Sequence, residues 1–425
     1  MTIHRVFSLL AMSLLATLAL ADEAPEGQGL RVNGFGTLGL AHADTDFGGS
    51  FRRDISQEID KQGILSEPDS RLGVQLNYAV NQQVELTGQL VLKKRLASNQ
   101  PLDSVEWAFV SYRPLPDVTL RAGRISTDFF LVSDYRNVGF GYVPVRPNVD
   151  FYSMISLQEF DGLDMSKRWT TGETQWQVKA FTGKAAYQTR SSLDNFQLGE
   201  VTDVMGVVLG MEQDGWLARA TLSNNKLEFK DVDLGPIKQA LASVASLPVA
   251  NVAAQARDMS AQILSRDIDM TYASFGVSYD KNNWLLCAEW MRTFSNAPVT
   301  AIQANYAMVG RRFGNLTLHT GISAVSTTSK PIADPQWAQS LAPLIGPGAA
   351  QQVQLVGSSV AQVMNAGRIE QNTVSLGLRW DFDPRMALKA QWDHVNVKPN
   401  GNVMWSGQAS GGQANVVSVA VDFLF

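Results

Sequence analysis

The most informative stretch of the sequence lies near its C-terminal end and reads Thr373-Val374-Ser375-Leu376-Gly377-Leu378-Arg379-Trp380-Asp381-Phe382. Every second residue of this stretch is apolar, and the residues between are polar, small or charged. Successive side chains of a β-strand point to opposite sides, so sustained alternation indicates a strand with one apolar face. The stretch is therefore predicted to be a strand whose two faces meet different surroundings.

The same alternation recurs along the whole chain. Leu72, Val74, Leu76 and Tyr78 alternate with polar residues in a second clear case. Similar segments bring the total to sixteen predicted strands, near 30–42, 71–78, 83–95, 103–113, 117–124, 159–169, 173–183, 203–213, 215–224, 269–280, 283–294, 300–312, 315–326, 373–382, 386–393 and 415–425.

The connections between these segments also alternate, between short and long. The short ones carry turn residues such as Asp, Asn, Gly and Pro, and lie at 81–83, 115–117, 170–172, 214–215, 282–283, 314–315 and 383–384. Most of the others are long: 43–69, 125–158, 184–202, 225–268, 327–368 and 398–414. An even number of strands with tight turns at one end and long loops at the other is typical of an all-β, antiparallel up-and-down barrel that spans the outer membrane.

Composition excludes several other classes of protein. Only 18% of residues are charged, against a typical value of about 25%, and no apolar run is long enough for a transmembrane helix. Cys287 is the single cysteine, which excludes a disulfide framework. The net charge of −5, without basic blocks, argues against a nucleic-acid partner.

The N-terminal segment has the pattern of a secretory signal peptide. Arg5 precedes the apolar run 6–20, and Ala19-Leu20-Ala21 supplies a small-residue cleavage site. We therefore expect residues 1–21 to be removed and residues 22–425 to form one barrel domain.

Aromatic residues gather close to the short turns. They are Trp169, Trp176, Trp216, Trp284, Phe313, Trp380 and Trp392. Aromatic girdles of this kind mark the membrane interfaces of a transmembrane barrel. The alternative is a soluble β-sandwich, in which tryptophans that anchor the core would lie in mid-strand.

Three stretches of the chain resemble the Gram-negative trimeric porins of the outer membrane. They are the terminal Val421-Asp422-Phe423-Leu424-Phe425, the hairpin 372–392, and Val32-Asn33-Gly34-Phe35-Gly36-Thr37-Leu38-Gly39 near the start of the mature chain. The resemblance implies a homotrimer in outer-membrane lipid that passes small hydrophilic solutes and ions by passive diffusion. It also implies that Phe423 and Phe425 are the signal read by the outer-membrane assembly machinery.

The same resemblance implies that the third long loop, 125–158, folds into the lumen and narrows it. This loop carries Asp128, Asp134 and Asp150 among many aromatic residues. Strand parity places four basic residues on the inner wall, namely Arg71, Lys93, Arg95 and Arg121. An acidic loop facing a basic wall would create a transverse field that sorts solutes by size and charge. The alternative is that these are ordinary lumen-facing polar residues.

Two of the long loops carry helical periodicity. Residues 236–264 and 334–364 place apolar residues at spacings of three and four, and both segments are interrupted by proline. Each is predicted to be a helical hairpin inserted between strands. Such hairpins could cap the mouth of the barrel, bind a partner, or simply pack on the barrel rim.

The sequence carries no convincing catalytic, cofactor or metal motif. Residues 34–39 match G-x-G-x-x-G, but no helix follows them, and the pairs Asp44/Asp46 and Asp231/Asp233 lack the distant glutamate of a calcium loop. The mature histidines, His42, His319 and His394, have no setting that suggests an activated nucleophile. We therefore expect a channel and not an enzyme. A substrate-specific channel, and an outer-membrane enzyme or surface interaction protein, remain as alternatives.

One predicted strand departs from the general pattern. In 283–294, Trp284, Leu286, Ala288 and Trp290 share one face, which leaves Leu285 and Met291 pointing into the lumen. Alternation alone gives no reason for apolar residues on a water-facing wall.

Overall fold

The structure, a computed structural model, describes residues 29–57, 62–95, 104–155, 157–190, 196–230, 232–406 and 411–425. The predicted signal peptide, 1–21, lies outside the described residues. Within the described ranges, no helix is both long enough and apolar enough to cross a membrane.

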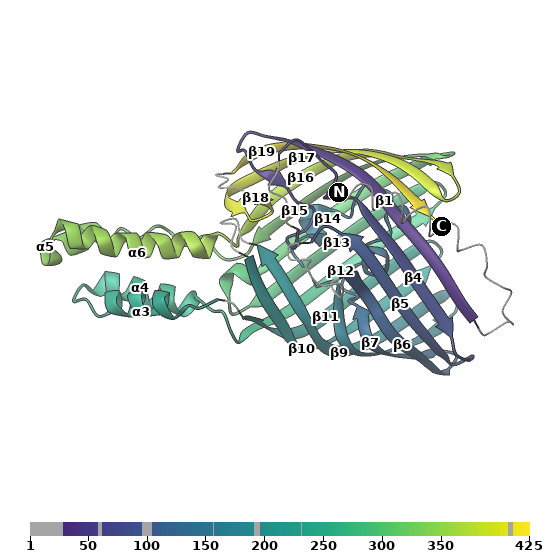
Figure 1. The fold of residues 1–425 in the computed structure, drawn as a ribbon, viewed down its shortest axis with the longest axis horizontal. Helices are drawn as coiled ribbons and strands as arrows, with labels where there is room; N and C mark the ends of the chain where they lie inside the picture. The colour runs from purple at the N-terminus through teal and green to yellow at the C-terminus, as the bar shows by residue number, and fades with distance from the viewer. Residues whose placement is uncertain are drawn as a thin grey trace, which may run out of the picture.

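Sixteen antiparallel strands form a closed barrel (Figure 1). Each strand pairs with its neighbours in chain order, and the sheet closes because β1 pairs with both β4 and β19. The strands are β1 (Gly29–Thr45), β4 (Arg71–Ala79), β5 (Val84–Lys93), β6 (Val105–Leu115), β7 (Val118–Ser126), β8 (Glu159–Thr171), β9 (Thr174–Arg190), β10 (Phe196–Gln213), β11 (Trp216–Phe229), β12 (Ile268–Lys281), β13 (Trp284–Ser295), β14 (Ile302–Phe313), β15 (Leu316–Thr327), β16 (Ile369–Asp383), β17 (Met386–Asn402) and β19 (Gly412–Leu424). The predicted sixteen-stranded up-and-down barrel is confirmed.

Short strands and short helices lie at the long-loop end of the barrel and in its interior. The strands β2 (Ser50–Phe51) and β18 (Trp405–Ser406) pair with each other, and β3 (Ile64–Leu65) pairs with β1. Loop 125–158 contains the 3-10 helices η3 (Ser133–Tyr135) and η4 (Gly139–Gly141) and the single-turn helix α2 (Val149–Tyr152). A further 3-10 helix, η5 (Pro298–Thr300), joins β13 to β14.

The tight turns have the backbone geometry that their residues predict. Asp214 and Gly215 have φ values of 50° and 84°, and Asn282 and Asn283 have values of 55° and 64°. Two consecutive positive φ angles are those of a type I′ turn, whose twist matches that of the two strands it joins.

The outer face of the barrel is apolar. Leu38 is 67% exposed, and large apolar side chains are exposed on the outward positions of most strands. Close to the short turns this face carries the exposed aromatic residues Trp169, Trp216, Trp284, Phe313 and Trp380. Exposing so many apolar side chains to water would be highly unfavourable. An apolar band that faces lipid and is bounded by aromatic residues is the surface of an outer-membrane barrel. The predicted location of the barrel in the outer membrane is confirmed, and the sandwich alternative is wrong.

The last strand closes the barrel against the first. The Phe425 N–H donates to the Gly34 oxygen over 2.9 Å, and the Gly34 N–H donates to the Phe425 oxygen over 2.7 Å. The rings of Phe423 and Phe425 lie over Gly36 and Gly34, where a side chain on either glycine would overlap the ring. These two aromatic residues therefore complete the seam, and their role in assembly stays a prediction.

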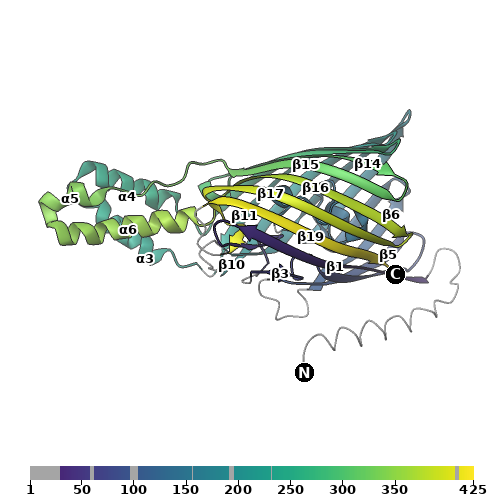
Figure 2. The ribbon, with the colours of Figure 1, turned by 90° about the horizontal axis from the view of Figure 1, so that it is seen from above.

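Both predicted helical hairpins are present. They are α3 (Gly235–Ala245) with α4 (Ala250–Gln262), and α5 (Trp337–Ile345) with α6 (Pro347–Asn365). The four helices project from one end of the barrel and lie beside one another (Figures 1 and 2). Leu241, Val252, Trp337 and Leu341 are buried between them, and the Trp337 indole N–H donates to Gln255 Oε1 over 2.8 Å. The buried side chains of the two hairpins thus share one apolar cluster, in which the hairpins pack on each other.

Candidate pore and its constriction

Loop 125–158 crosses the interior of the barrel. The Leu131 N–H donates to Glu289 Oε2 of β13 over 3.0 Å. On β16, the Arg379 guanidinium donates to the Phe140 and Tyr142 oxygens over 2.7 and 3.0 Å. The loop joins β7 to β8, so it contacts inward-facing side chains of strands that lie far from β7 and β8 around the wall.

A buried ion pair holds the middle of the loop to the seam of the barrel. The Lys389 ammonium lies 2.8 Å from Asp422 Oδ2, and both side chains are fully buried. The Thr37 hydroxyl donates to the other Asp422 oxygen over 2.5 Å. Lys389 also donates to the main-chain oxygens of the loop residues Gly139, Tyr142 and Pro144. Burial of these charges is tolerable because each is paired and hydrogen-bonded.

Arg146, near the end of the same loop, makes a second buried attachment. Its guanidinium binds both Asp69 oxygens, over 2.9 and 2.6 Å, and reaches Asp393 and Ser418 on the wall. Burial alone would raise the pKa of Asp69, but the charge and hydrogen bonds of Arg146 hold that pKa below its usual range.

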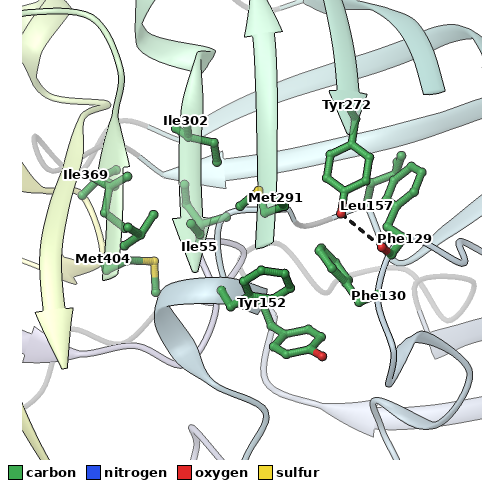
Figure 3. Close-up of a cluster of buried hydrophobic side chains, with 14 of the residues drawn as sticks. Ile55, Phe129, Phe130, Tyr152, Leu157, Tyr272, Met291, Ile302, Ile369 and Met404 are labelled. Atoms are coloured by element: carbon green, nitrogen blue, oxygen red, sulfur yellow. Dashed lines mark hydrogen bonds between the residues drawn. The ribbon is translucent and has the colours of Figure 1, made fainter. Parts of the chain in front are cut away.

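The opposite side of the loop packs into an apolar cluster inside the barrel (Figure 3). Phe129, Phe130 and Tyr152 of the loop meet Tyr272 and Met291 of the wall. The Tyr272 hydroxyl donates to the Phe129 oxygen over 3.1 Å, which fixes the loop backbone at this point. The inward-facing Met291 is fully buried in this cluster, so its place on the inner face of β13 is explained by apolar packing and not by contact with water. Leu285 lies outside the cluster and is buried beside Gly310 of the neighbouring strand.

The apolar cluster extends well beyond these contacts. Phe51 and Ile55, from the connection between β1 and β4, belong to it. So do inward-facing wall residues on several strands, including Ile268, Ile302, Val325, Ile369, Val395 and Val416. Much of the lumen is therefore filled by packed side chains at this level.

The three acidic residues predicted for the constriction have separate partners. Asp128 forms a buried ion pair with Lys179 of β9. Asp134 lies 3.6 Å from an Arg219 nitrogen of β11. Asp150 accepts hydrogen bonds from Gln371 and Ser323, over 2.6 and 2.7 Å, and burial raises its pKa.

The four basic residues predicted for the wall also have their own partners. Lys93 and Arg95 lie 2.7 and 2.6 Å from the same oxygen of Glu106. Arg121 is paired with Asp164 on the neighbouring strand over 2.5 Å, and Arg71 donates to the main-chain oxygen of Arg136 over 3.4 Å.

Among the described residues, none of the three acids forms an ion pair with any of these four bases. Lys93 and Arg71 do form hydrogen bonds with the loop, to Asn137 and Arg136 respectively. Arg121 instead pairs with Asp164 within the wall. Five of these seven charges thus have an opposite charge of their own nearby, whereas Asp150 and Arg71 are bonded to neutral groups.

Residues that the sequence analysis did not single out make many of these contacts. Lys179, Arg219 and Lys389 face inward on their strands, so strand parity could have found them. Glu106 lies where the pairing of β5 with β6 shifts register, so simple alternation could not place it.

Two polar cavities remain between the loop and the wall formed by β5 to β9. One has a volume of about 150 Å³ and is lined by Lys93, Arg95, Arg124 and Glu159 among others. The second has a volume of only about 20 Å³, room for about one water molecule, and is lined by Gln89, Trp107, Asp134, Tyr135 and Asn137 among others. Glu106 and Gln158 line both cavities, which therefore adjoin.

Solved structures share this architecture. OmpT, an outer membrane protein of Vibrio cholerae, is 15% identical with a TM-score of 0.50, and the match covers 95% of this chain and 100% of that one. OmpF of Salmonella typhi in complex with daunomycin is 13% identical with a TM-score of 0.51, covering 95% and 99%. An anion-selective porin from Comamonas acidovorans is 12% identical with a TM-score of 0.51, covering 94% and 100%.

This chain has the porin fold. No protein-family model matches the sequence, and no curated protein matches it either. The likeness therefore concerns the arrangement of the strands, and what the porin-fold barrel does must be argued from its own residues.

Within this porin-fold barrel, the described residues include no group of three or more histidine, cysteine, aspartate or glutamate side chains placed to hold a metal ion. The three histidines that the structure describes lie on three different strands, and His394 contacts Asn415 over 3.0 Å. In the same described part of the chain, no histidine is hydrogen-bonded to a serine or a carboxylate. Of the acidic pairs noted in the sequence, Asp46 accepts an N–H bond from Gln413, and Asp231 lies outside the described residues.

Proposed function

We propose that this protein is an outer-membrane channel through which small hydrophilic solutes and ions diffuse passively. The short turns of such barrels lie on the periplasmic side, so the long loops and the four helices would face the outside. Selection would rest on the width of the passage and on the charges that line it, with no reaction catalysed.

The observation that carries this proposal is the pair of adjoining polar cavities between loop 125–158 and β5 to β9. Elsewhere the loop is tied to the wall by buried ion pairs and apolar packing. Solutes would therefore pass the Lys93–Glu106–Arg95 group and then Asp134 of the loop. Asp128, Asp150 and Arg71 would serve mainly to hold the loop in place, because they are buried and bonded there.

The direct test is conductance in a planar lipid bilayer. Folded protein is expected to insert in discrete conductance steps and to show a current that rises in proportion to salt concentration. Preparations that are fully folded by circular dichroism and yet form no channels would contradict the proposal.

A substrate-specific channel is the second candidate. It is favoured by the large part of the lumen that packed apolar side chains occupy among the described residues. Conductance that is blocked in a saturable way by one sugar, acid or phosphate would support it over general diffusion.

We also propose that the barrel assembles as a homotrimer, which rests on the porin resemblance of the sequence. Mass measurement of the detergent-solubilised complex tests this directly. A monomeric mass in a preparation that still conducts would show that trimerisation is not required.

A further inference from the structure

A groove lies on the outer face of the barrel, over the neighbouring strands β12 to β15 that are labelled in Figure 1. It has a volume of about 380 Å³ and a mainly apolar lining. The residues that line it include Phe275, Ala288, Trp290, Ala307, Ile322 and Ala324, which all lie at outward positions of their strands. The groove is therefore part of the surface that faces lipid.

The pairing of the strands explains why the surface is hollowed here. Ala288 of β13 pairs with Ala307 of β14, so two methyl side chains lie next to each other on the wall. Ile322 of β15 pairs with Ala307 and is 63% exposed, and Trp290 follows Ala288 on the same face of β13 and is 38% exposed. The two alanines thus form a low floor between large apolar side chains.

An acyl chain is the group that the surroundings of this groove offer. The groove is continuous with the apolar band of the barrel, which lies in the hydrocarbon of the outer membrane. Unfilled space beside apolar side chains loses their dispersion contacts, and a flexible chain of methylene groups can restore those contacts. The shape and the chemistry of the groove therefore fit the tail of a lipid.

The upper end of β13 lies at the level of the lipid headgroups. Trp284 begins this strand beside the short turn, and Phe294, which is also exposed, follows it by ten residues. With about 3.4 Å per residue and a tilt of about 45°, ten residues rise about 24 Å, close to the height of about 25 Å of the apolar band. Phe294 therefore lies near the interface at the long-loop end.

Arg292 brings a positive charge to this interface. It lies on the same outward face as Trp290, two residues closer to the long loops, and its guanidinium carbon is 4.8 Å from the centre of the Phe294 ring. Its Nε has no hydrogen-bond partner, and in the described part of the chain no carboxylate lies within ion-pair distance of it. A guanidinium group in this position can bind a phosphate, since its paired N–H groups match two phosphate oxygens.

We propose that this groove and Arg292 form a binding site for an anionic membrane lipid, with an acyl chain over Ala288 and Ala307 and the headgroup phosphate on Arg292. The apolar groove and the unpaired charge lie on adjacent levels of the same strands, as the two parts of an anionic lipid do. Because the long loops of such barrels face the outside, the lipid belongs to the outer leaflet.

The experiment is native mass spectrometry of the folded full-length protein in detergent, titrated with phosphatidylglycerol. We expect one lipid per chain to be retained, with an affinity at least about tenfold higher than that for phosphatidylcholine of the same chain length. Arg292→Gln should lose this preference, because it removes charge-assisted hydrogen bonds to the phosphate. Ala307→Trp should weaken the binding of both lipids, because the indole fills the groove.

Arg311→Gln is the matched control. Arg311 also lies on the outer face, with its guanidinium carbon 4.4 Å from the centre of the Trp284 ring, but Leu286 and Val309 separate it from the groove. This variant should retain phosphatidylglycerol as wild type does. All these substitutions lie on the lipid-facing surface, and each folded variant is compared with wild type.

Three results would overturn the proposal. The first is equal retention of phosphatidylglycerol by wild type, Arg292→Gln and Ala307→Trp. The second is displacement of the lipid by inorganic phosphate at constant ionic strength, which would show that Arg292 binds a dissolved anion without the groove. The third is an oligomer without retained lipid that Ala307→Trp dissociates, which would show that a second copy of the chain occupies the groove. None of these results depends on whether the barrel conducts ions.

Discussion

Lys389 shows how a single buried charge can fix a loop inside a barrel. Its ammonium is paired with Asp422 at the seam and bonded to three loop oxygens. Removing one member of a buried ion pair leaves the other charge without a partner. The stability lost in this way is generally larger than the stability that the intact pair contributes.

We therefore expect Lys389→Met to lower the free energy of unfolding by about 3–5 kcal/mol. The double variant Lys389→Met/Asp422→Asn should lose less of its free energy of unfolding, because it leaves no buried charge without a partner. Reversible urea unfolding in detergent measures both values. The exposed Lys281–Asp214 pair supplies the control, and Lys281→Met should have no measurable effect. Equal stability of Lys389→Met and this control would contradict the interpretation.

Asp150 makes a contribution to the stability of the folded chain that depends on pH, and its direction follows from the raised pKa of this residue. Burial raises its pKa in the folded chain, so the folded chain holds this proton to a higher pH than the unfolded chain does. Its contribution to stability is therefore fully present below the ordinary pKa of about 4 and is lost as the pH rises through the raised value.

The corresponding prediction compares wild-type protein with Asp150→Asn, which cannot titrate. The stability of wild type relative to the variant should decrease as the pH is raised from about 4 toward neutrality. Unfolding of both proteins at a series of pH values tests this. A difference that stays constant or increases with pH would show that Asp150 is not in the environment described here.

At the scale of elements, the aromatic part of loop 125–158 determines how much of the lumen is filled. Phe129 and Phe130 are almost completely buried against the wall. Phe130→Ala should cost about 3–5 kcal/mol of stability and increase single-channel conductance, because the space it leaves would adjoin the cavity through which we propose that solutes pass. Phe313→Ala, on the exposed outer face, is the control and should leave the conductance unchanged. Equal conductance of Phe130→Ala and wild type would mean that the cluster does not limit flow.

The four helices form a unit that is separate from the barrel wall. Their buried side chains, including Leu241 and Trp337, contact the other hairpin. Replacing both hairpins with short turns should therefore leave barrel stability and conductance intact. Replacing one hairpin alone should expose the apolar face of the other and increase its cleavage in limited proteolysis. Loss of conductance in the double replacement would instead indicate that the helices gate the mouth.

At the scale of the whole molecule, the sequence predicted the barrel well because alternation is a local property. All sixteen predicted strands are present, and both helical hairpins appear where the period changes. The predicted long connection 184–202 is wrong, because β9 continues to Arg190 and β10 begins at Phe196. Prediction failed where partners are distant in sequence: Lys389 and Gly139 meet only after the barrel has closed. Glu106 was missed for a local reason, since a register shift moves it out of the pattern.

In the proposed channel, ions pass between loop 125–158 and the wall of β5 to β9. The reversal potential across a salt gradient tests it most directly, with wild type compared with Lys93→Gln. Lys93→Gln leaves Glu106 paired with Arg95, so the variant should fold. Arg257→Gln, on exposed α4, serves as the control. We expect wild type to conduct and Lys93→Gln to shift the reversal potential toward cation preference, whereas the control should leave it unchanged. A reversal potential that Lys93→Gln does not change would show that ions do not take this route.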